Sequence, residues 1–594
     1  MTIVDEINLA LKQYNKGKKN YAYKKIIKIF LKNKNNLKLR YNVAVIEQDL
    51  GLFKKAEENY KYLINNNFDI RSKINLYNLY IKQNQFNNAL VLIEEVIKEN
   101  DQILITYQDK ANVLYKLKNY DESINECKSI IKLEPQNIKI LNLLGLCYLK
   151  KENFDLAKDT FLNTLNIDQN NIITLNYLGR LNHEIRNSKE AEKYFLRAIK
   201  LNPNIFETLN NIAGFYLEEA EYDKALYFFK KAEEINSQNS VLLDNIAKTY
   251  SSIGKIIEAE KYCKAAIKLN SSDDNIKKTL SLIHLKNNNF KKAWEYFDGR
   301  LNLSDFVAKN STINLIKHKI PKYNNIDKSA KILIIREQGV GDEILYGTMY
   351  SDLLEEFPNV TIECDERLIP LFKNSFDISH ENKFVKLGLY SSNKNEIDKF
   401  KYIIYAGSLG KFFRNDIKSF PSTPYLKKLD SYNDLELDKI IKEFDGFKIG
   451  ISWKSFKNRY ALEKSLKLND FDHLFKLKNC IFFNLQYGNV DEELSQFIKK
   501  TNYKIISLKD LDLFNNIVGI VNLLSKLDFF ITVSNSTAHI AGALGIKTIL
   551  IKPISHASFH YWDYNNNKTP WYKNVKIISK KDLLNKKIIS QLFI

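Results

Sequence analysis

The sequence predicts a solenoid of paired α-helices followed by an α/β part that contains two doubly wound parallel sheets. The first observation is a repeat with a period of 34 residues between about residues 5 and 301, because periods of this length are the signature of repeat architectures. The second is a change near Lys331, where short apolar runs begin to alternate with helical segments. We therefore expect a solenoid, a linker and two sheet-bearing halves, at residues 1–303, 304–327, 328–435 and 436–594.

Three positions define the repeat. Small side chains recur on the first helix of each pair, and twelve residues later a second small position recurs on the partner helix, followed by a bulkier one. The three sets are Ala111, Gly145, Gly179, Ala213 and Ala247; then Ser123, Ala157, Ala191, Ala225, Ala259 and Ala293; and then Cys127, Phe161, Phe195, Phe229, Cys263 and Phe297. These spacings resemble tetratricopeptide repeats, and about eight or nine units fit the region.

The resemblance implies a superhelix with a concave groove that holds an extended peptide or a partner protein. We therefore predict a protein or peptide partner. Asparagines recur on the first helices, where their amides could bracket a peptide backbone. The alternative is a solvated face in an asparagine-rich protein, and the sequence leaves both open. The residues in question are Asn142, Asn176, Asn210 and Asn245.

The composition argues against several other classes of protein. No stretch of eighteen apolar residues occurs and the N-terminal residues carry charge, so we expect no transmembrane segment and a cytoplasmic location. The five cysteines are scattered singly, which fits neither a disulfide framework nor a zinc site, and we expect no metal. The net charge is +20, but lysines are interleaved with glutamates and no arginine-rich segment occurs. We therefore predict no nucleic-acid partner.

The first of three candidate loops follows the apolar run KILII, where a glycine-containing turn leads into a helix. Carboxylates directly after the glycines would repel a pyrophosphate, so this is not a dinucleotide-binding turn. The loop suits acid–base chemistry, and Asp342 could accept a proton from an attacking hydroxyl. Its alternative role is that of a helix-capping carboxylate. The candidate acceptor loop comprises Gln338, Gly339, Gly341, Asp342 and Glu343.

The second candidate follows the apolar run IGIS and contributes to a donor pocket. Lys454 and Arg459 could neutralise phosphate charge on a nucleotide leaving group, or they are surface cations in a chain with 90 Lys and Arg residues. The next apolar run ends at a further edge of this pocket. The donor-side residues of these two loops are Ser452, Trp453, Lys454, Arg459, Gln486 and Tyr487.

The third candidate follows the run LDFFITV, where a hydroxyl-rich turn opens a helix of small residues. Hydroxyls and backbone amides at a helix N-terminus suit a phosphate, so we interpret this loop as a diphosphate site. His539 lies one turn into the helix, and it either faces the site or is a packed histidine bonded to the backbone. The residues are Ser534, Asn535, Ser536, Thr537, Ala538 and His539.

Together, G-x-G-D after the first run and V-S-N-S-T-A-H-I-A-G-A-L-G later in the chain resemble the inverting bacterial heptosyltransferases of lipopolysaccharide synthesis, over about residues 330–580. The resemblance implies the GT-B fold, in which two Rossmann-like sheets face a cleft, and no metal. It also implies that Asp342 is the base and that the Ser534–Ala541 loop holds the donor nucleotide. Ser534 stands where the family usually has aspartate. The order of repeats and transferase is similar to that of O-linked N-acetylglucosamine transferases.

We therefore expect inverting glycosyl transfer from a nucleotide-diphosphate sugar, used as co-substrate with no further cofactor, to a hydroxyl of a protein or glycan. Asp342 would deprotonate the acceptor, while Lys454 and the loop up to His539 would stabilise the departing diphosphate. The repeats would recruit the acceptor. The alternative is a non-catalytic adaptor with a degenerate transferase domain, and Ser534 is the residue that favours it.

Overall fold

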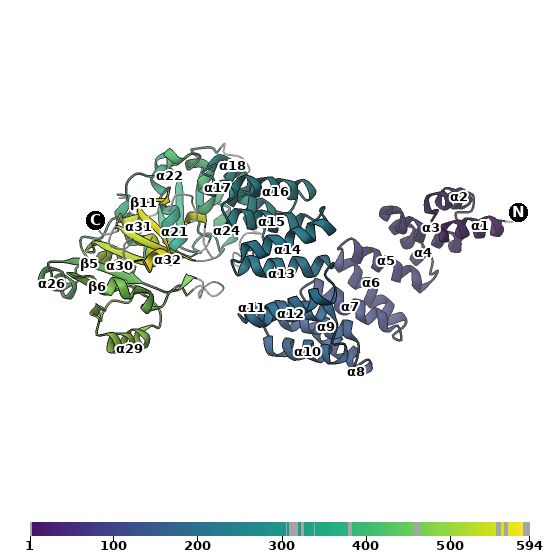
Figure 1. The fold of residues 1–594 in the computed structure, drawn as a ribbon. Coiled ribbons are helices and arrows are strands. Elements are labelled where there is room, and N and C mark those ends of the chain that lie inside the picture. Colours follow the sequence, from purple (N-terminus) through teal and green to yellow (C-terminus); the bar gives the residue numbers. More distant parts are fainter. Residues whose placement is uncertain are drawn as a thin grey trace. The chain divides into compact units, whose positions relative to one another are not determined.

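The computed structural model describes most of the chain, and its elements are drawn in Figure 1. The chain divides into two compact units, Met1–Ile212 and Ala213–Ile594. Two candidate residues, Gln338 and Arg459, and most of the predicted linker lie outside the described residues. The described residues are 3–303, 306–307, 316, 319–321, 326–337, 339–377, 383–456, 464–553, 560–562 and 568–585.

The first unit consists of helix pairs. In its described residues, twelve helices of 13 or 14 residues follow one another with short turns between them. Asparagine caps several first helices; for example, Oδ1 of Asn171 accepts from the Thr174 amide at 3.0 Å. The helices are α1 (Ile3–Asn15), α2 (Lys19–Lys32), α3 (Leu37–Asp49), α4 (Phe53–Asn65), α5 (Ile70–Lys82), α6 (Phe86–Glu99), α7 (Leu104–Lys116), α8 (Tyr120–Leu133), α9 (Ile138–Lys150), α10 (Phe154–Ile167), α11 (Ile172–Glu184) and α12 (Ser188–Leu201).

Close packing within each pair explains the sequence repeat. A Cβ atom added at Gly179 of α11 would lie 2.6 Å from the Phe195 ring of α12, and one at Gly145 of α9 would overlap the Phe161 ring of α10. Both phenylalanines are buried. The small position of the first helix therefore receives the bulky side chain of the second helix. The predicted helical solenoid over the N-terminal half of the chain is confirmed.

The second unit contains further helix pairs and two sheets (Figure 1). The boundary between the units falls within α13 (Phe206–Glu218), after which the helices are α14 (Tyr222–Ile235), α15 (Ser240–Ser252), α16 (Ile256–Leu269), α17 (Asp274–Lys286) and α18 (Phe290–Phe297). The first sheet has the order β3-β2-β1-β4 and is parallel throughout. Its strands are β1 (Ile332–Ile335), β2 (Val360–Cys364), β3 (Phe384–Lys386) and β4 (Tyr402–Tyr405). The helices of this region are α21 (Val340–Gly347), α22 (Tyr350–Glu356), α23 (Ile369–Ser375), α24 (Lys394–Ile397) and α25 (Gly410–Phe413).

The second sheet has the order β10-β11-β9-β8-β5-β6-β7, and all its strand pairs except β10–β11 are parallel. The order from β7 to β11 is that of doubly wound α/β sheets. Its strands are β5 (Phe447–Ser452), β6 (Cys480–Asn484), β7 (Ile505–Ile506), β8 (Phe529–Val533), β9 (Thr548–Lys552), β10 (Lys568–Thr569) and β11 (Tyr572–Ser579). Its helices are α26 (Leu435–Glu443), α28 (Asp472–Phe475), α29 (Asp491–Thr501), α30 (Ile517–Ser525), α31 (Ser536–Leu544) and α32 (Lys580–Leu583).

The two sheets confirm an α/β region after the solenoid, and their strand orders locate its candidate sites. Open α/β sheets bind ligands at the carboxyl ends of the strands, next to the point where the strand order reverses. In the first sheet this point lies between β1 and β4, and in the second it lies between β5 and β8. The three candidate loops follow β1, β5 and β8, so all three lie at these points.

The last helix pair shares its apolar core with both sheets. Trp294 of α18 donates its indole N–H to the carbonyl of Arg414 at 2.7 Å. The Phe290 ring lies 4.7 Å from that of Phe420, which in turn lies 4.9 Å from the Trp571 ring in the β10–β11 turn. One buried cluster contains apolar residues of this helix pair and of both sheets. The end of the solenoid is therefore built into the α/β region.

Gly145→Ala is expected to destabilise the first unit by about 1–3 kcal/mol, because the added methyl group would overlap the Phe161 ring. In a Phe161→Cys background the same change should have little effect, because Ala111 and Cys127 occupy these positions in the preceding repeat. Urea unfolding followed by circular dichroism measures both differences. An equal loss of stability in the two backgrounds would contradict the assigned packing.

Candidate functional site

Two of the predicted loops meet at the N-termini of α21 and α31. A Cβ atom added at Gly341 would lie 3.0 Å from Cδ2 of His539 and 3.3 Å from Cα of Ser536. Gly341 follows β1 in the first sheet, whereas Ser536 and His539 follow β8 in the second. The fold therefore brings together two loops that are almost two hundred residues apart in the sequence, and a larger residue at position 341 would require Ser536 and His539 to shift.

Asp342 lies in the first turn of α21, and its side chain is 6% exposed. Its Oδ2 atom accepts from the Gly339 amide at 3.4 Å, so the carboxylate caps its own helix. Its Oδ1 atom accepts from the Tyr561 hydroxyl at 3.3 Å. The capping role considered from the sequence is thus observed, while the role as a base stays a prediction. Tyr561 occupies the position at Oδ1 that an acceptor hydroxyl would need.

His539 is buried in a cluster of aromatic side chains. Its Nδ1 atom lies 3.2 Å from the Tyr572 hydroxyl. Its ring centroid lies 4.9 Å from that of Tyr561 and 4.8 Å from that of Trp562. Burial raises the pKa of Tyr561 and of Tyr572 well above the ordinary tyrosine value, so both hydroxyls remain protonated donors. Sequence reasoning missed these three aromatic residues, because no motif relates them to the loops that they contact.

Glu343 points into a polar cluster of the first sheet. Arg336 donates to its Oε1 atom at 2.6 Å and the Asp365 amide donates to Oε2 at 2.8 Å. Burial raises the pKa of Glu343 to about 7, although Arg336 acts in the opposite direction. Arg367 donates its Nε to Asp365 at 2.8 Å and completes the cluster. The Glu343 side chain therefore bonds α21 to the residues that follow β1 and β2.

Four predicted donor residues tie the loops of the second sheet together. The Gln486 side-chain carbonyl accepts from the amides of Trp453 and Lys454, at 2.8 and 2.6 Å, and from the Ser452 hydroxyl at 3.0 Å. Asn535 donates to Ser452 Oγ at 2.8 Å and caps α31 by accepting from the Ala538 amide at 3.1 Å. Ser452, Trp453, Gln486 and Asn535 are all buried. In this conformation they hold the loops after β5, β6 and β8 and present little surface to a ligand.

The remaining described residues of the donor side are either buried or only partly exposed. Lys454 forms an ion pair with Glu493 of α29, so its charge is already partly neutralised by the protein. Ser534, Thr537 and Ala538 are buried, whereas Ser536 and Tyr487 are partly exposed. Of the predicted diphosphate loop, Ser536 at the N-terminus of α31 is therefore the residue that keeps partial exposure. Which of these groups bind a donor stays a prediction.

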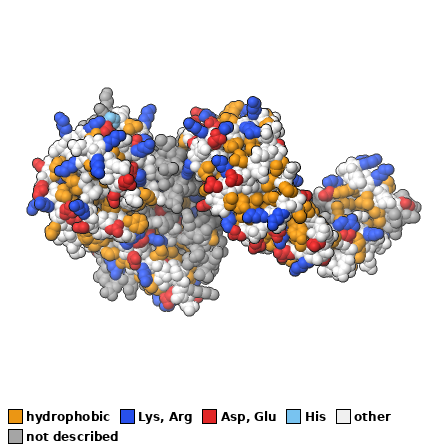
Figure 2. Space-filling view, turned by 90° about the horizontal axis from the view of Figure 1, so that it is seen from below, with side chains coloured by type: hydrophobic (Ala, Val, Ile, Leu, Met, Phe, Trp, Pro, Cys, Tyr) orange, Lys and Arg blue, Asp and Glu red, His pale blue; other side chains and the backbone are white. Residues whose placement is uncertain are grey.

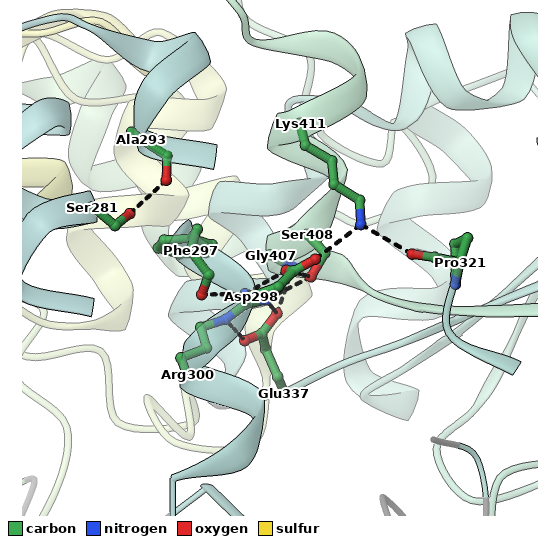
Figure 3. Close-up of polar contacts among 10 residues, drawn as sticks. All are labelled: Ser281, Ala293, Phe297, Asp298, Arg300, Pro321, Glu337, Gly407, Ser408 and Lys411. Atoms are coloured by element: carbon green, nitrogen blue, oxygen red, sulfur yellow. Dashed lines mark hydrogen bonds and ion pairs between the residues drawn. The ribbon is translucent and has the colours of Figure 1, made fainter. Parts of the chain in front are cut away.

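Ion pairs at the end of β1 join the first loop to the solenoid (Figure 3). Arg300, in the 3-10 helix η1 (Asp298–Asn302), donates Nε and Nη2 to the Glu337 carboxylate at 2.8 and 2.9 Å. The Gly407 amide after β4 donates to the same carboxylate at 2.6 Å. Glu337 precedes the glycine turn that carries Asp342. A residue of the last repeat thus fixes the backbone on both sides of the reversal point of the first sheet.

A second carboxylate extends this network. Asp298 accepts from the Ser408 hydroxyl at 2.6 Å and from Lys411 at 2.9 Å, as drawn in Figure 3. Burial acts to raise the pKa of Asp298, but Arg300 and Lys411 hold it below its ordinary value. Every charge in the cluster therefore has an opposite partner, which is the condition under which buried ions are tolerated.

Two of the repeat asparagines form hydrogen bonds between neighbouring repeats, a role that neither interpretation of the sequence included. Oδ1 of Asn142 accepts from the Thr174 hydroxyl at 2.9 Å, and Nδ2 of Asn176 donates to the Thr208 hydroxyl at 2.8 Å. Each bond joins a repeat to the next, and both asparagines are 6% exposed. Close stacking of successive helices therefore withdraws them from solvent and from a groove ligand. In the second unit Asn245 is half-buried, and Asn210 of the first unit has a buried Oδ1 with no hydrogen-bond partner among the described residues.

The surface charge is mixed. Figure 2 shows basic and acidic side chains interspersed with hydrophobic ones on the face that it presents. Exposed apolar side chains recur on the repeats; Leu133 is 74% exposed and Ile257 is 83% exposed. The mixture of both charge signs on this face differs from the basic stripe that is typical of polyanion-binding proteins.

A pocket of about 220 Å³ lies at the opposite, C-terminal end of α31. It is lined by residues of the chain that links the two sheets, such as Pro424 and Tyr425, and by Gly545 and Asn574. Neither Asp342 nor Ser534 lines it, but Tyr572, whose hydroxyl lies 3.2 Å from His539, does. Among the residues that the structure describes, no cluster of potential metal ligands occurs and no helix is long and apolar enough to cross a membrane.

Comparison with known proteins identifies the repeats. The tetratricopeptide repeat family matches residues 105–137, 138–171, 175–205 and 242–273, which lie within α7 to α12 and α15 to α16. The solenoid is therefore built from tetratricopeptide repeats, which support a role in protein interaction. Protein FlbA of Caulobacter vibrioides is 26% identical over 269 residues, covering 42% of this chain and 43% of that protein. The chain thus spans less than half the length of this distant relative.

Solved tetratricopeptide repeat structures show a partial likeness to this chain. A tetratricopeptide repeat protein from Parabacteroides merdae is 18% identical with a TM-score of 0.38, and the likeness covers 42% of this chain and 98% of that one. The MamA protein of Desulfovibrio magneticus is 19% identical with a TM-score of 0.27, covering 28% of this chain and 95% of that one.

Arg300→Met should destabilise the second unit by about 3–5 kcal/mol, because it leaves the Glu337 carboxylate charged, buried and without its cation. Adding Glu337→Gln should recover part of this loss, since the buried charge is then removed. All four tryptophans lie in this unit, so tryptophan fluorescence during denaturant unfolding reports on it alone. Equal losses in the single and double variants would show that the ion pair is not the source of the effect.

Proposed function

We propose that the chain is an inverting glycosyltransferase of GT-B architecture that transfers a sugar from a nucleotide-diphosphate donor to a hydroxyl of a protein or glycan. The observation that carries this proposal is the meeting of the β1 and β8 loops, in which Gly341 lies against Ser536 and His539. A donor held at one loop would then lie beside the carboxylate of the other. The cytoplasm, where nucleotide sugars are made, is the compartment that fits this chemistry.

The proposed reaction is a direct displacement. The acceptor oxygen forms a bond to the anomeric carbon, while the bond from that carbon to the diphosphate oxygen breaks. The acceptor proton passes to Asp342, and the nucleoside diphosphate leaves with the negative charge. The Ser536 hydroxyl and the first amides of α31 are placed to stabilise this charge. The Tyr561 hydroxyl must leave Asp342 before an acceptor can enter.

The tetratricopeptide repeats supply the proposed acceptor arm. Such arrays bind extended peptides or partner proteins along their surface. The Arg300–Glu337 pair and the shared apolar core attach the last repeat directly to the loop that carries Asp342. An acceptor held on the repeats would therefore be tethered to the reaction site, which raises its effective concentration there.

A non-catalytic adaptor is the second candidate, and one observation favours it. Ser452, Gln486 and Asn535 are buried and bonded to the loops, while Tyr561, Trp562 and His539 pack tightly beside Asp342. An adaptor would keep this packed arrangement permanently, whereas a transferase must open it. Binding of nucleoside diphosphates with a rise in melting temperature would favour the transferase.

Asp342→Asn should reduce the release of nucleoside diphosphate at least about 100-fold when the purified chain is supplied with nucleotide sugars and a hydroxyl acceptor, because the proton acceptor is lost. Thermal shift by nucleoside diphosphates should persist, since the donor loop is unchanged. The matched control is Asp377→Asn in the same region, whose side chain is 79% exposed and should have no effect. Full turnover by the Asp342→Asn variant would refute the assigned base.

A further inference from the structure

Three aromatic residues follow three neighbouring strands of the second sheet. Phe456 lies beyond the end of β5, Tyr487 beyond β6 and Phe514 beyond β7. Their ring centroids are 5.7 Å apart between Phe456 and Tyr487, and 6.2 Å apart between Tyr487 and Phe514. The three rings, which we call the aromatic platform, therefore form a continuous apolar surface along the carboxyl edge of this sheet.

The outer rings of the platform are solvent-exposed. Phe456 is 43% exposed and Phe514 is 59% exposed, while Tyr487 between them is partly buried. Burial in the protein core therefore does not account for the two phenylalanines. Exposed aromatic rings in one contiguous cluster indicate a binding surface.

The backbone holds these rings in place. Gly488 adopts φ +91, and a Cβ there would lie 2.5 Å from the Phe456 ring, so this turn is open to glycine alone. The Asp512 carboxylate accepts from the Phe514 amide at 2.8 Å. Arg367 of the first sheet donates to the Phe514 carbonyl at 2.8 Å, and its guanidinium lies 5.6 Å from the Phe514 ring centroid. The platform is preorganised, which lowers the entropy cost of binding a flat ligand.

We propose that the aromatic platform binds the base of the donor nucleotide by stacking, which deepens the proposed function and rests on it. Ligands of a doubly wound sheet lie across the carboxyl edge, beside the reversal point between β5 and β8. Ser536 at that point offers the phosphate contact, and the platform continues from there along β5, β6 and β7. A nucleotide has this composition: an anionic group next to a flat aromatic ring.

The location favours a base over a protein partner. The loop that carries Phe456 is bonded to the turn before α31, because Asn535 donates to the Lys454 carbonyl at 3.5 Å. A helix N-terminus and a hydroxyl-rich turn suit phosphate, whereas a protein partner requires neither. Arg367 adds a cation beside Phe514, and a stacked base gains from both the ring and the guanidinium. Because every base has a π-face, stacking itself does not choose the base, and a panel of nucleotides is needed to identify it.

The test measures binding of ADP, GDP, UDP, CDP and dTDP by calorimetry, with pyrophosphate as the probe that lacks a base. Phe514→Ala should weaken the nucleotide that the wild type binds about 5- to 100-fold, and Phe514→Trp should restore it. Pyrophosphate binding should be equal in all variants. The matched control is Phe447→Ala, because Phe447 is also 43% exposed but lies at the opposite, amino edge of the same sheet.

The outcomes separate this inference from the proposed function. Equal nucleotide affinity in wild type, Phe514→Ala and Phe456→Ala would overturn the base subsite and leave the transferase proposal standing. Loss of affinity in these variants, together with full turnover by Asp342→Asn, would support the base subsite and refute the proposed catalytic step. Binding of single-stranded oligonucleotides but of no mononucleotide would also overturn the inference, because the platform would then be a nucleic-acid surface.

Discussion

The arrangement of the α/β region depends on the close approach of Gly341 to Ser536 and His539. The carboxyl ends of β1 and β8 belong to different sheets, and their following helices, α21 and α31, meet N-terminus to N-terminus. Two partial positive helix ends at one point create a field that favours an anion. Asp342 supplies one negative charge there, and a diphosphate would supply another. In the proposed function, the two helix ends would offset the repulsion between Asp342 and the diphosphate.

Around this contact, the protein uses most of its polar side chains to hold its own loops. Gln486 gathers three donors from the β5 loop, Asn535 bridges two loops and caps a helix, and Arg300 fixes Glu337 next to the glycine turn. The last repeat, the first sheet and the β10–β11 turn share one apolar core. The same residues that end the solenoid therefore define the geometry of the candidate site.

The sequence was sufficient to predict the helical solenoid and the α/β region that follows it. Small residues that recur every 34 positions indicate where two helices are in contact. At Gly145, for example, a larger side chain would collide with Phe161. Short apolar runs locate parallel strands, and strand ends locate loops.

Side-chain partners could not be predicted in the same way. The sequence assigned Lys454 to phosphate charge and Gln486 to a pocket edge, but it did not reveal that Lys454 pairs with Glu493 or that Gln486 accepts from amides of the β5 loop. For Asn142 the sequence left a groove contact and a solvated face open, and it did not reveal the hydrogen bond from the Thr174 hydroxyl of the next repeat. In each case the partner comes from another element, and residue type alone does not reveal it. Tyr561 was missed for the same reason.

The most direct test of the central claim is the affinity of Gly341→Ala for nucleoside diphosphates, measured beside its rate of nucleoside diphosphate release. Alanine favours the α21 helix locally, so the fold should persist, while the new methyl group pushes His539 and Ser536 away. The account predicts that both affinity and turnover fall, whereas Gly214→Ala, which adds a methyl group where no atom lies within 4 Å, changes neither. Wild-type affinity and turnover in Gly341→Ala would contradict the claim that the two loops form one site.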